Sequence, residues 1–234
     1  MTVAFDAATE SHTAGSGSAN QASFTWNHTA AAGANGLLVF VFTNADASDI
    51  TSVVMTTNNI TLDVVSGGRA VDSAGEAGRC DAYFYAGPVP SGSQAIVVNR
   101  TNNSDVMYAV SISVTAAQVP QIVSGDIVLT QGDGTLAEVS VAHGSISGMG
   151  FAGVNSGLPT PPAQGASSTQ LHTIDYTARS TPVCRETTAG TGSRSFGFSD
   201  AGSDDRAAVH LVISESGNKG IIFNPVPFQP HLVR

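Results

Sequence analysis

The side chains best suited to acid–base or metal chemistry in this chain are its six histidines, His12, His28, His143, His172, His210 and His231. None lies in a His-x-His or His-Glu-x-x-His pattern, which would place two imidazoles on one metal ion, so we expect no zinc site. Residues 144–148 read Gly-Ser-Ile-Ser-Gly, and their offset is wrong for the Gly-x-Ser-x-Gly elbow that exposes a nucleophilic serine. A Ser-His-Asp triad assembled by folding stays open, because these residue types are plentiful.

Carboxylates are the next group that could do chemistry. A glycoside hydrolase needs two carboxyl groups that face a cleft. The five glutamates match no such signature: Glu10, Glu76, Glu138, Glu186 and Glu215. Residues 44–49 and 200–205 are acidic loops that offer the oxygen ligands Ca²⁺ prefers, although neither has EF-hand spacing. We interpret both as solvated turns, with calcium binding as the alternative. The sequence thus predicts no enzyme, no metal site and no cofactor.

Composition and charge exclude other classes of function. The net charge is −9 and Lys219 is the only lysine, so no basic patch is present to bind nucleic-acid phosphates. The longest apolar run, residues 37–42, is too short to cross a membrane, and the first residues lack the pattern of a signal peptide. We therefore expect neither nucleic acid nor membrane as a partner. We interpret Cys80 and Cys184 as free buried thiols, with a disulfide as the alternative.

Short strands are the elements that must position these residues. Apolar and polar residues alternate with a period of two, and Gly, Asn, Asp and Ser bound the runs. In residues 21–28 the alternation places Phe24, Trp26 and His28 on one face. Residues 37–43 form a continuous apolar run, which is typical of a strand covered on both faces. About fourteen such strands, with no internal repeat of fixed period, predict an all-β antiparallel sandwich.

Four aromatic side chains allow two interpretations. Trp26, Tyr83, Tyr85 and Tyr108 could form a platform on which sugar rings stack, or they could belong to the core. Aromatic residues make up 6% of the chain and most of them lie inside predicted strands, so we interpret these four as core residues.

The last residues differ in kind from the rest of the chain. Pro225, Pro227 and Pro230 exclude a helix and a central strand, because each proline fixes φ and lacks an N–H. The intervening residues are nevertheless too apolar for a solvated tail. The sequence therefore predicts a β-sandwich body over residues 1–216 and an extended docking arm over residues 217–234. The predicted partner-binding side chains are Ile221, Ile222, Phe223, Val226, Phe228 and Leu232.

Several stretches of the body occur in a familiar order. Residues 23–29 read Ser-Phe-Thr-Trp-Asn-His-Thr, residues 36–41 read Gly-Leu-Leu-Val-Phe-Val, and residues 50–54 read Ile-Thr-Ser-Val-Val. Residues 81–88 form an aromatic strand that ends in proline, and residues 91–98 form a glycine turn and a valine-rich strand. The chain resembles the jelly-roll-type β-sandwich domains of bacterial secreted proteins and phage virion proteins. The resemblance covers roughly residues 3–215, and it concerns fold rather than chemistry.

The resemblance and the arm together suggest a function. Our leading hypothesis is a phage virion structural protein, specifically a capsid decoration (cement) protein that attaches through its sandwich and its arm. Its partners would be a major capsid or tail protein and further copies of itself, in a virion assembled in the host cytoplasm. The alternative is a carbohydrate-binding or adhesive module, including a tail or fibre component, that faces host-surface glycans. A lyase or esterase on a jelly roll is the third interpretation.

Overall fold

The computed structural model describes residues 2–11, 21–44, 50–72, 78–101, 106–142, 147–176 and 179–216. Nearly every element in these ranges is an antiparallel β-strand, and the exceptions are two short 3₁₀ turns, η1 (Thr57–Asn59) and η2 (Ser124–Asp126). The all-β prediction is confirmed. Within the described ranges, no helix is long and apolar enough to pass through a bilayer.

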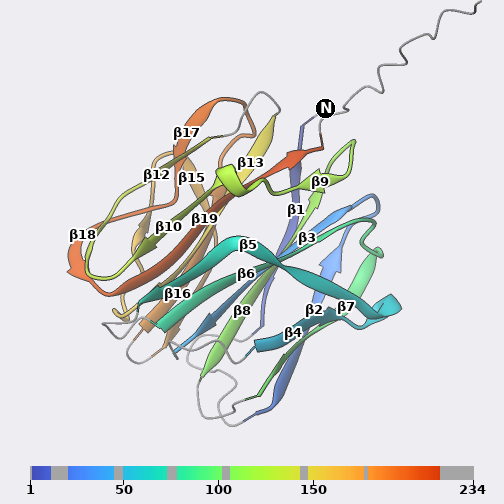
Figure 1. Cartoon of the computed structure of the whole chain (residues 1–234), viewed down its shortest axis with the longest axis horizontal. Helices are drawn as coiled ribbons and strands as arrows, with labels where there is room; N and C mark the ends of the chain where they lie inside the picture. The colour runs from blue at the N-terminus through green and yellow to red at the C-terminus, as the bar shows by residue number, and fades with distance from the viewer. Residues whose placement is uncertain are drawn as a thin grey trace, which may run out of the picture.

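The first half of the chain folds as an eight-stranded jelly roll, which we call roll 1 (Figure 1). Its strands lie in the order β1-β8-β3-β6-β5-β4-β7-β2. The pairs β1·β8, β2·β7, β3·β6 and β4·β5 nest inside one another, which is the double Greek-key order of a jelly roll. The strands are β1 (Ala4–Glu10), β2 (Ser23–Ala30), β3 (Gly36–Thr43), β4 (Ile50–Met55), β5 (Ile60–Asp72), β6 (Gly78–Ala86), β7 (Gly92–Arg100) and β8 (Met107–Thr115).

The second half, roll 2, repeats this pairing order. The sheet β10-β19-β13-β16-β15 corresponds to β1-β8-β3-β6-β5, and the sheet β11-β18-β14 corresponds to β2-β7-β4. The pair β12·β17 continues β11·β18 beyond a break in both strands. The strands are β9 (Pro120–Gln121, in the connection), β10 (Ile127–Gln131), β11 (Gly134–Leu136), β12 (Val139–Ala142), β13 (Gly148–Ser156), β14 (Ala163–Gln164), β15 (Ser168–Tyr176), β16 (Arg179–Glu186), β17 (Ser193–Phe196), β18 (Phe198–Asp204) and β19 (Arg206–Glu215).

The sequence shows no internal repeat of fixed period, but the structure shows a duplication. The repeat lies in the strand pairing rather than in the sequence. One local trace of it is a left-handed glycine at the start of the seventh strand of each roll, with φ of 85° at Gly92 and 80° at Gly192. A side chain at either position would be strained, because only glycine adopts this conformation readily.

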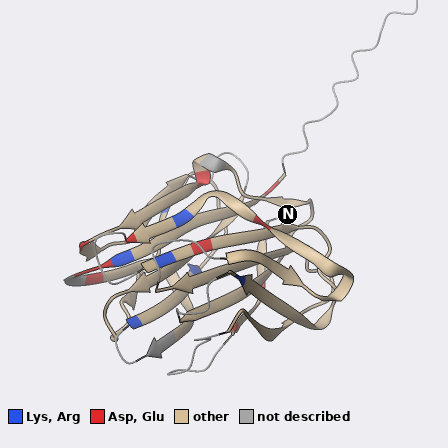
Figure 2. Ribbon diagram, turned by 60° about the horizontal axis from the view of Figure 1, so that its bottom comes forward, with Lys and Arg blue, Asp and Glu red and all other residues tan. Residues whose placement is uncertain are grey.

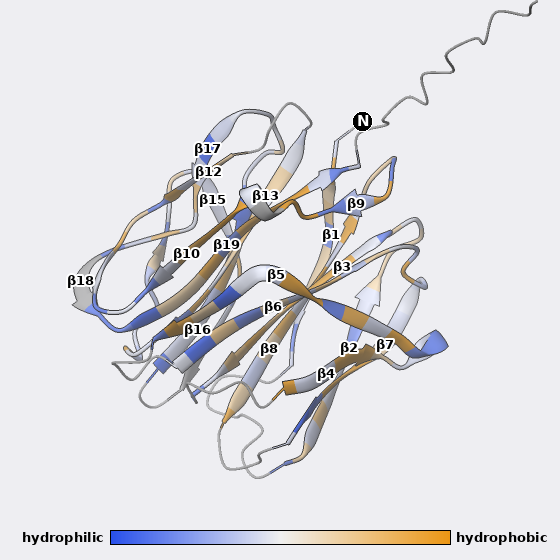
Figure 3. Cartoon of the chain, viewed as in Figure 1, coloured by the Kyte–Doolittle hydropathy of each residue, from blue (hydrophilic) through white to orange (hydrophobic). Residues whose placement is uncertain are grey.

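The two rolls pack through their equivalent sheets and share one core. This shared core includes side chains of β3, β6 and β8 on one side and of β13, β16 and β19 on the other. β5 of roll 1 packs against β10 of roll 2. Their counterparts, β15 of roll 2 and β1 of roll 1, also pack against each other, so the contact between the rolls is symmetric. Large members of the shared core are Phe40, Phe42, Tyr108, Phe151 and Leu211. Figure 3 shows the hydrophobic colour on the central strands, including β3 and β19.

Each roll also has an inner core of its own. In roll 1, Leu37, Val39 and Val41 face this inner core, while the alternate residues of β3 face the shared core. All eight residues of β3 are buried, so the predicted strand covered on both faces is confirmed. Trp26 and Phe24 lie on the inner face of β2 as predicted. The inner core of roll 2 is built around Phe196 and Phe198.

Candidate functional site

The predicted partner-binding side chains, Ile221, Ile222, Phe223, Val226, Phe228 and Leu232, lie outside the described residues. The described part of the chain ends at Ser216. The N–H of Ser216, the last described residue, donates to the carbonyl of Val119 at 2.9 Å. Just before it, Glu215 and Ser214 pair with Pro120 and Gln121 of β9. The described part of the chain therefore ends beside the connection between the two rolls.

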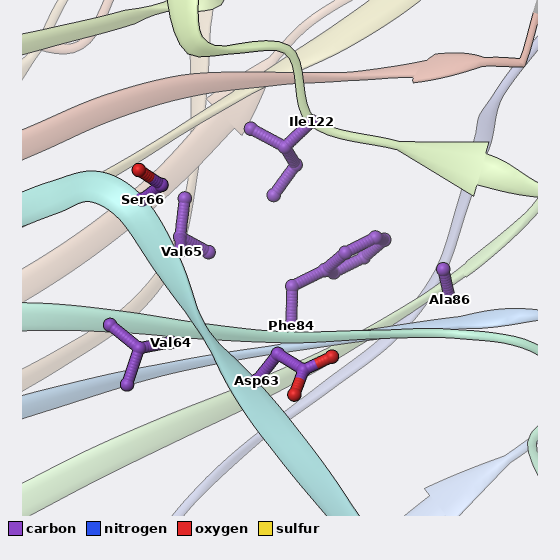
Figure 4. Close-up of a pocket in the computed structure, with 7 residues that line it drawn as sticks. All are labelled: Asp63, Val64, Val65, Ser66, Phe84, Ala86 and Ile122. Carbon is purple, nitrogen blue, oxygen red and sulfur yellow. The ribbon is translucent and has the colours of Figure 1, made fainter.

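A pocket lies next to this connection. Its volume is about 210 Å³, and its lining comes from β5, β6 and the residue that follows β9. Figure 4 shows Val65, Phe84 and Ile122 pointing toward one another across it. We call this the seam pocket; it is lined by Asp63, Val64, Val65, Ser66, Phe84, Ala86 and Ile122.

Exposed apolar side chains gather around the same connection. Among the described residues, four large hydrophobic side chains are exposed, and three of them belong to the seam pocket or to the connection: Val64, Val119 and Val123. The fourth, Leu158, lies in the loop after β13 of roll 2. Sequence reasoning missed this surface, because its members come from two separate parts of the chain and each reads as an ordinary strand or loop residue.

A polar network in roll 1 contains the residue types of a catalytic triad. His28 Nε2 lies 2.9 Å from Ser113 Oγ, and His28 Nδ1 lies 3.1 Å from Ser111 Oγ. The hydroxyl of Ser113 donates to Asp6 Oδ2 at 2.6 Å. Trp26 Nε1 donates to Ser111 Oγ at 2.9 Å. These contacts join β1, β2 and β8 at the edge of the inner core.

The order of contacts in this network differs from that of a triad. In a triad the carboxylate orients the imidazole and the imidazole takes the serine proton. Here Asp6 binds Ser113, whose proton is already donated to the carboxylate, and His28 is fully buried. Burial lowers the pKa of His28 to about 4, against a smaller opposing effect of Asp6. Burial thus favours the neutral imidazole, whose single N–H can donate to only one of the two serine oxygens. We interpret the cluster as a structural link between β1, β2 and β8.

Replacing Ser113 with alanine is expected to destabilise the protein by about 1–3 kcal/mol. The substitution leaves His28 Nε2 without its partner and removes one donor from Asp6. Urea unfolding at neutral pH measures the change. Ser93→Ala, on the exposed face of β7, is the control and should shift the midpoint little. Equal stability of the two variants would contradict the structural role assigned to the network.

The other two described histidines, His172 and His210, lie in separate surroundings. His210 is buried in roll 2 against Phe196, with ring centroids 6.1 Å apart, and burial lowers the pKa of His210 to about 4. His172 Nδ1 lies 3.4 Å from Glu10 Oε2, in a contact between the two rolls. His12, His143 and His231 lie outside the described residues.

The acidic loop at residues 200–205 has its carboxylates engaged locally. Asp200 pairs with Arg206 at 2.9 Å. Asp204 Oδ2 accepts hydrogen bonds from Ser156 Oγ at 2.8 Å and from the N–H of Leu158 at 3.0 Å. The other proposed loop, at residues 44–49, falls outside the description except for its first residue. Across the part of the chain that the structure describes, no three His, Cys, Asp or Glu side chains converge as metal ligands would.

The core interpretation of the aromatic residues is confirmed for three of the four. Trp26, Tyr83 and Tyr108 are each less than 10% exposed, and Tyr85 is partly buried. A sugar-stacking platform made of these rings is therefore not formed. The two cysteines are free and buried, as predicted. Figure 2 shows charged residues thinly scattered over both rolls.

No protein-family profile, no curated protein and no solved structure matches this chain.

Proposed function

We propose that this protein is a structural component of a phage virion, and specifically a capsid decoration protein. The observation that carries the proposal is the contrast between body and arm. The described strands end at Glu215, and the apolar, proline-spaced residues 221–232 follow them. Such a segment suits docking onto another protein better than folding on its own. Jelly rolls also recur in viral capsid proteins, although that support is analogy at the level of fold.

The mechanism is non-covalent attachment. Fifteen extended residues reach roughly 45–50 Å, which is enough to cross a subunit boundary. The distal side chains Val226, Phe228 and Leu232 would fill apolar pockets on a major capsid or tail protein, as interface hot spots do. An arm that orders on docking loses affinity, and many copies on one particle restore it. Self-association on the particle would add to this effect.

The polar character of the body fits the outside of a particle. Charged residues make up 12% of the chain, so hydroxyl and amide groups provide most of its polar surface. On β2 of roll 1 the outward side chains are Ser23, Thr25, Asn27 and Thr29. Such a neutral surface also suits the alternative function, a carbohydrate-binding or adhesive module that recognises host-surface glycans. Binding to a glycan array that is lost in Thr25→Val/Asn27→Leu would favour this alternative. We propose no catalytic activity.

The double variant Phe228→Ala/Leu232→Ala is expected to reduce incorporation into the parent particle by at least roughly a hundredfold. Each truncated hot spot costs about 2–4 kcal/mol, and about 1.4 kcal/mol corresponds to a factor of ten. Copy number per particle, measured by quantitative mass spectrometry, tests this result. Leu158→Ala is the control, because Leu158 is an exposed apolar residue of the body. Equal occupancy in the double variant would show that the arm is not the attachment element.

A further inference from the structure

We propose that the seam pocket is an intramolecular seat for the first part of the arm, with the ring of Phe223 inside the pocket and Ile221 and Ile222 against its rim. This inference goes beyond the proposed function and holds for the free protein, whatever the distal part of the arm binds.

The pocket has the size and the chemistry for this occupant. Val65 of β5, Phe84 of β6 and Ile122 of the connection provide apolar walls. An apolar cavity of about 150 Å³ accommodates benzene. The seam pocket, at about 210 Å³, therefore has room for a phenyl ring. Exposed Val64 and Val123 beside it would be covered by the neighbouring apolar residues of the arm.

The arm begins close enough to reach the pocket. The N–H of Ser216 binds the carbonyl of Val119. Ile122 follows Val119 by three residues, so the Cα atoms of Val119 and Ile122 lie no more than roughly 11 Å apart. Because β19 runs antiparallel to β9, a chain that reaches the pocket must first reverse its direction. Gly217 and Asn218 are residue types that favour such a turn. Five further extended residues cover roughly 16–18 Å, which brings Phe223 within reach of the pocket.

Charge favours the same placement. Asp63 lies on the pocket lining and is exposed. Lys219, the only lysine of the chain, precedes the apolar residues of the arm by two positions. An exposed pair of this kind contributes little energy, but it favours one direction of approach. Seating in the same chain is also favoured over binding to a second copy, because a short tether gives an effective concentration in the millimolar range.

Disulfide trapping in the full-length protein tests the proposal. Ser66→Cys places a thiol on the pocket lining, and Asn224→Cys places one next to Phe223 while leaving the ring intact. We expect this pair to form an intramolecular disulfide at least roughly tenfold faster than Ser195→Cys/Asn224→Cys, whose body thiol lies on β17 of roll 2. Cys80 and Cys184 are fully buried and should not compete.

A third variant separates docking of the ring from mere tethering. Adding Phe223→Ser to the Ser66→Cys/Asn224→Cys pair should return the rate to that of the control. Equal rates with and without Phe223, or no excess over the control, would overturn the proposal. A covalent dimer whose yield rises with protein concentration would overturn seating within the same chain. The test of the proposed function substitutes only the distal residues Phe228 and Leu232 and measures incorporation into the particle. A negative result in the trapping experiment therefore leaves the proposed function unaffected, and the reverse also holds.

Discussion

Replacing Phe151 with alanine is expected to lower the free energy of unfolding of the whole protein by about 3–5 kcal/mol. Phe151 belongs to β13 of roll 2, is fully buried and lies in the core that both rolls share. Truncation leaves a cavity between the rolls, and the opposing sheets can close it only in part. Because the shared core joins both rolls, we expect them to unfold in one transition.

Trp26 makes this expectation measurable. It is the only tryptophan of the chain and lies in the inner core of roll 1, away from the substituted residue. Urea unfolding of Phe151→Ala should be followed both by Trp26 fluorescence and by far-ultraviolet circular dichroism. The substitution should lower the two midpoints by the same amount. Leu158→Ala, on the surface of roll 2, should leave both curves nearly unchanged. A fluorescence midpoint that stays fixed while the dichroism curve splits would mean that the rolls are independent domains.

Lowering the pH from 7 to 4 is expected to destabilise the protein by about 3 kcal/mol for each of His28 and His210. Burial lowers the pKa of both to about 4 in the folded state, from an ordinary value of 6.5. The unfolded chain therefore binds protons first as the pH falls. The stability that depends on neutral imidazoles is fully present above pH 6.5, and it is lost as the pH falls toward 4.

Urea unfolding between pH 7 and pH 4 measures this loss. Carboxylates also titrate near the lower end of this pH range. The test therefore compares the pH dependence of the unfolding free energy between the wild type and the variants. His28 and His210 contribute equally to the loss of stability between pH 7 and pH 4. His28→Gln should therefore remove about half of the loss that these two histidines cause. His172→Gln, which replaces a partly exposed histidine beside Glu10, is the control. A pH dependence in His28→Gln that matches the wild type would show that His28 accepts a proton without cost in the folded state.

The sequence predicted the elements of roll 1 well because their side chains follow the strand period. The alternation of Phe24 and Trp26 with polar neighbours and the apolar run of β3 are local patterns, and both were confirmed. Such patterns predicted an all-β sandwich, and only the resemblance implied the jelly-roll type. The two-residue strands β9 and β14 carry no periodic signal, and the sequence did not reveal them.

The duplication could not be predicted, because matching strands of the two rolls carry different side chains. Residues 36–43 are rich in Leu, Val and Phe, whereas the corresponding β13 contains Gly150 and Gly153. Gly153 lies where a Cβ atom would come within 2.9 Å of the Phe40 ring, so its small size is set by the opposite roll. The seam pocket was equally hidden, because its walls meet only through tertiary packing.

The packing of two equivalent sheets in one chain also has an evolutionary consequence. An isologous dimer brings the same surface of two identical subunits together. Two rolls of one topology that meet through corresponding sheets are what the fusion of such a dimer would leave. The ancestral association surface would now be covered within each molecule. Each molecule would then present two outward faces with the same strand order but different side chains.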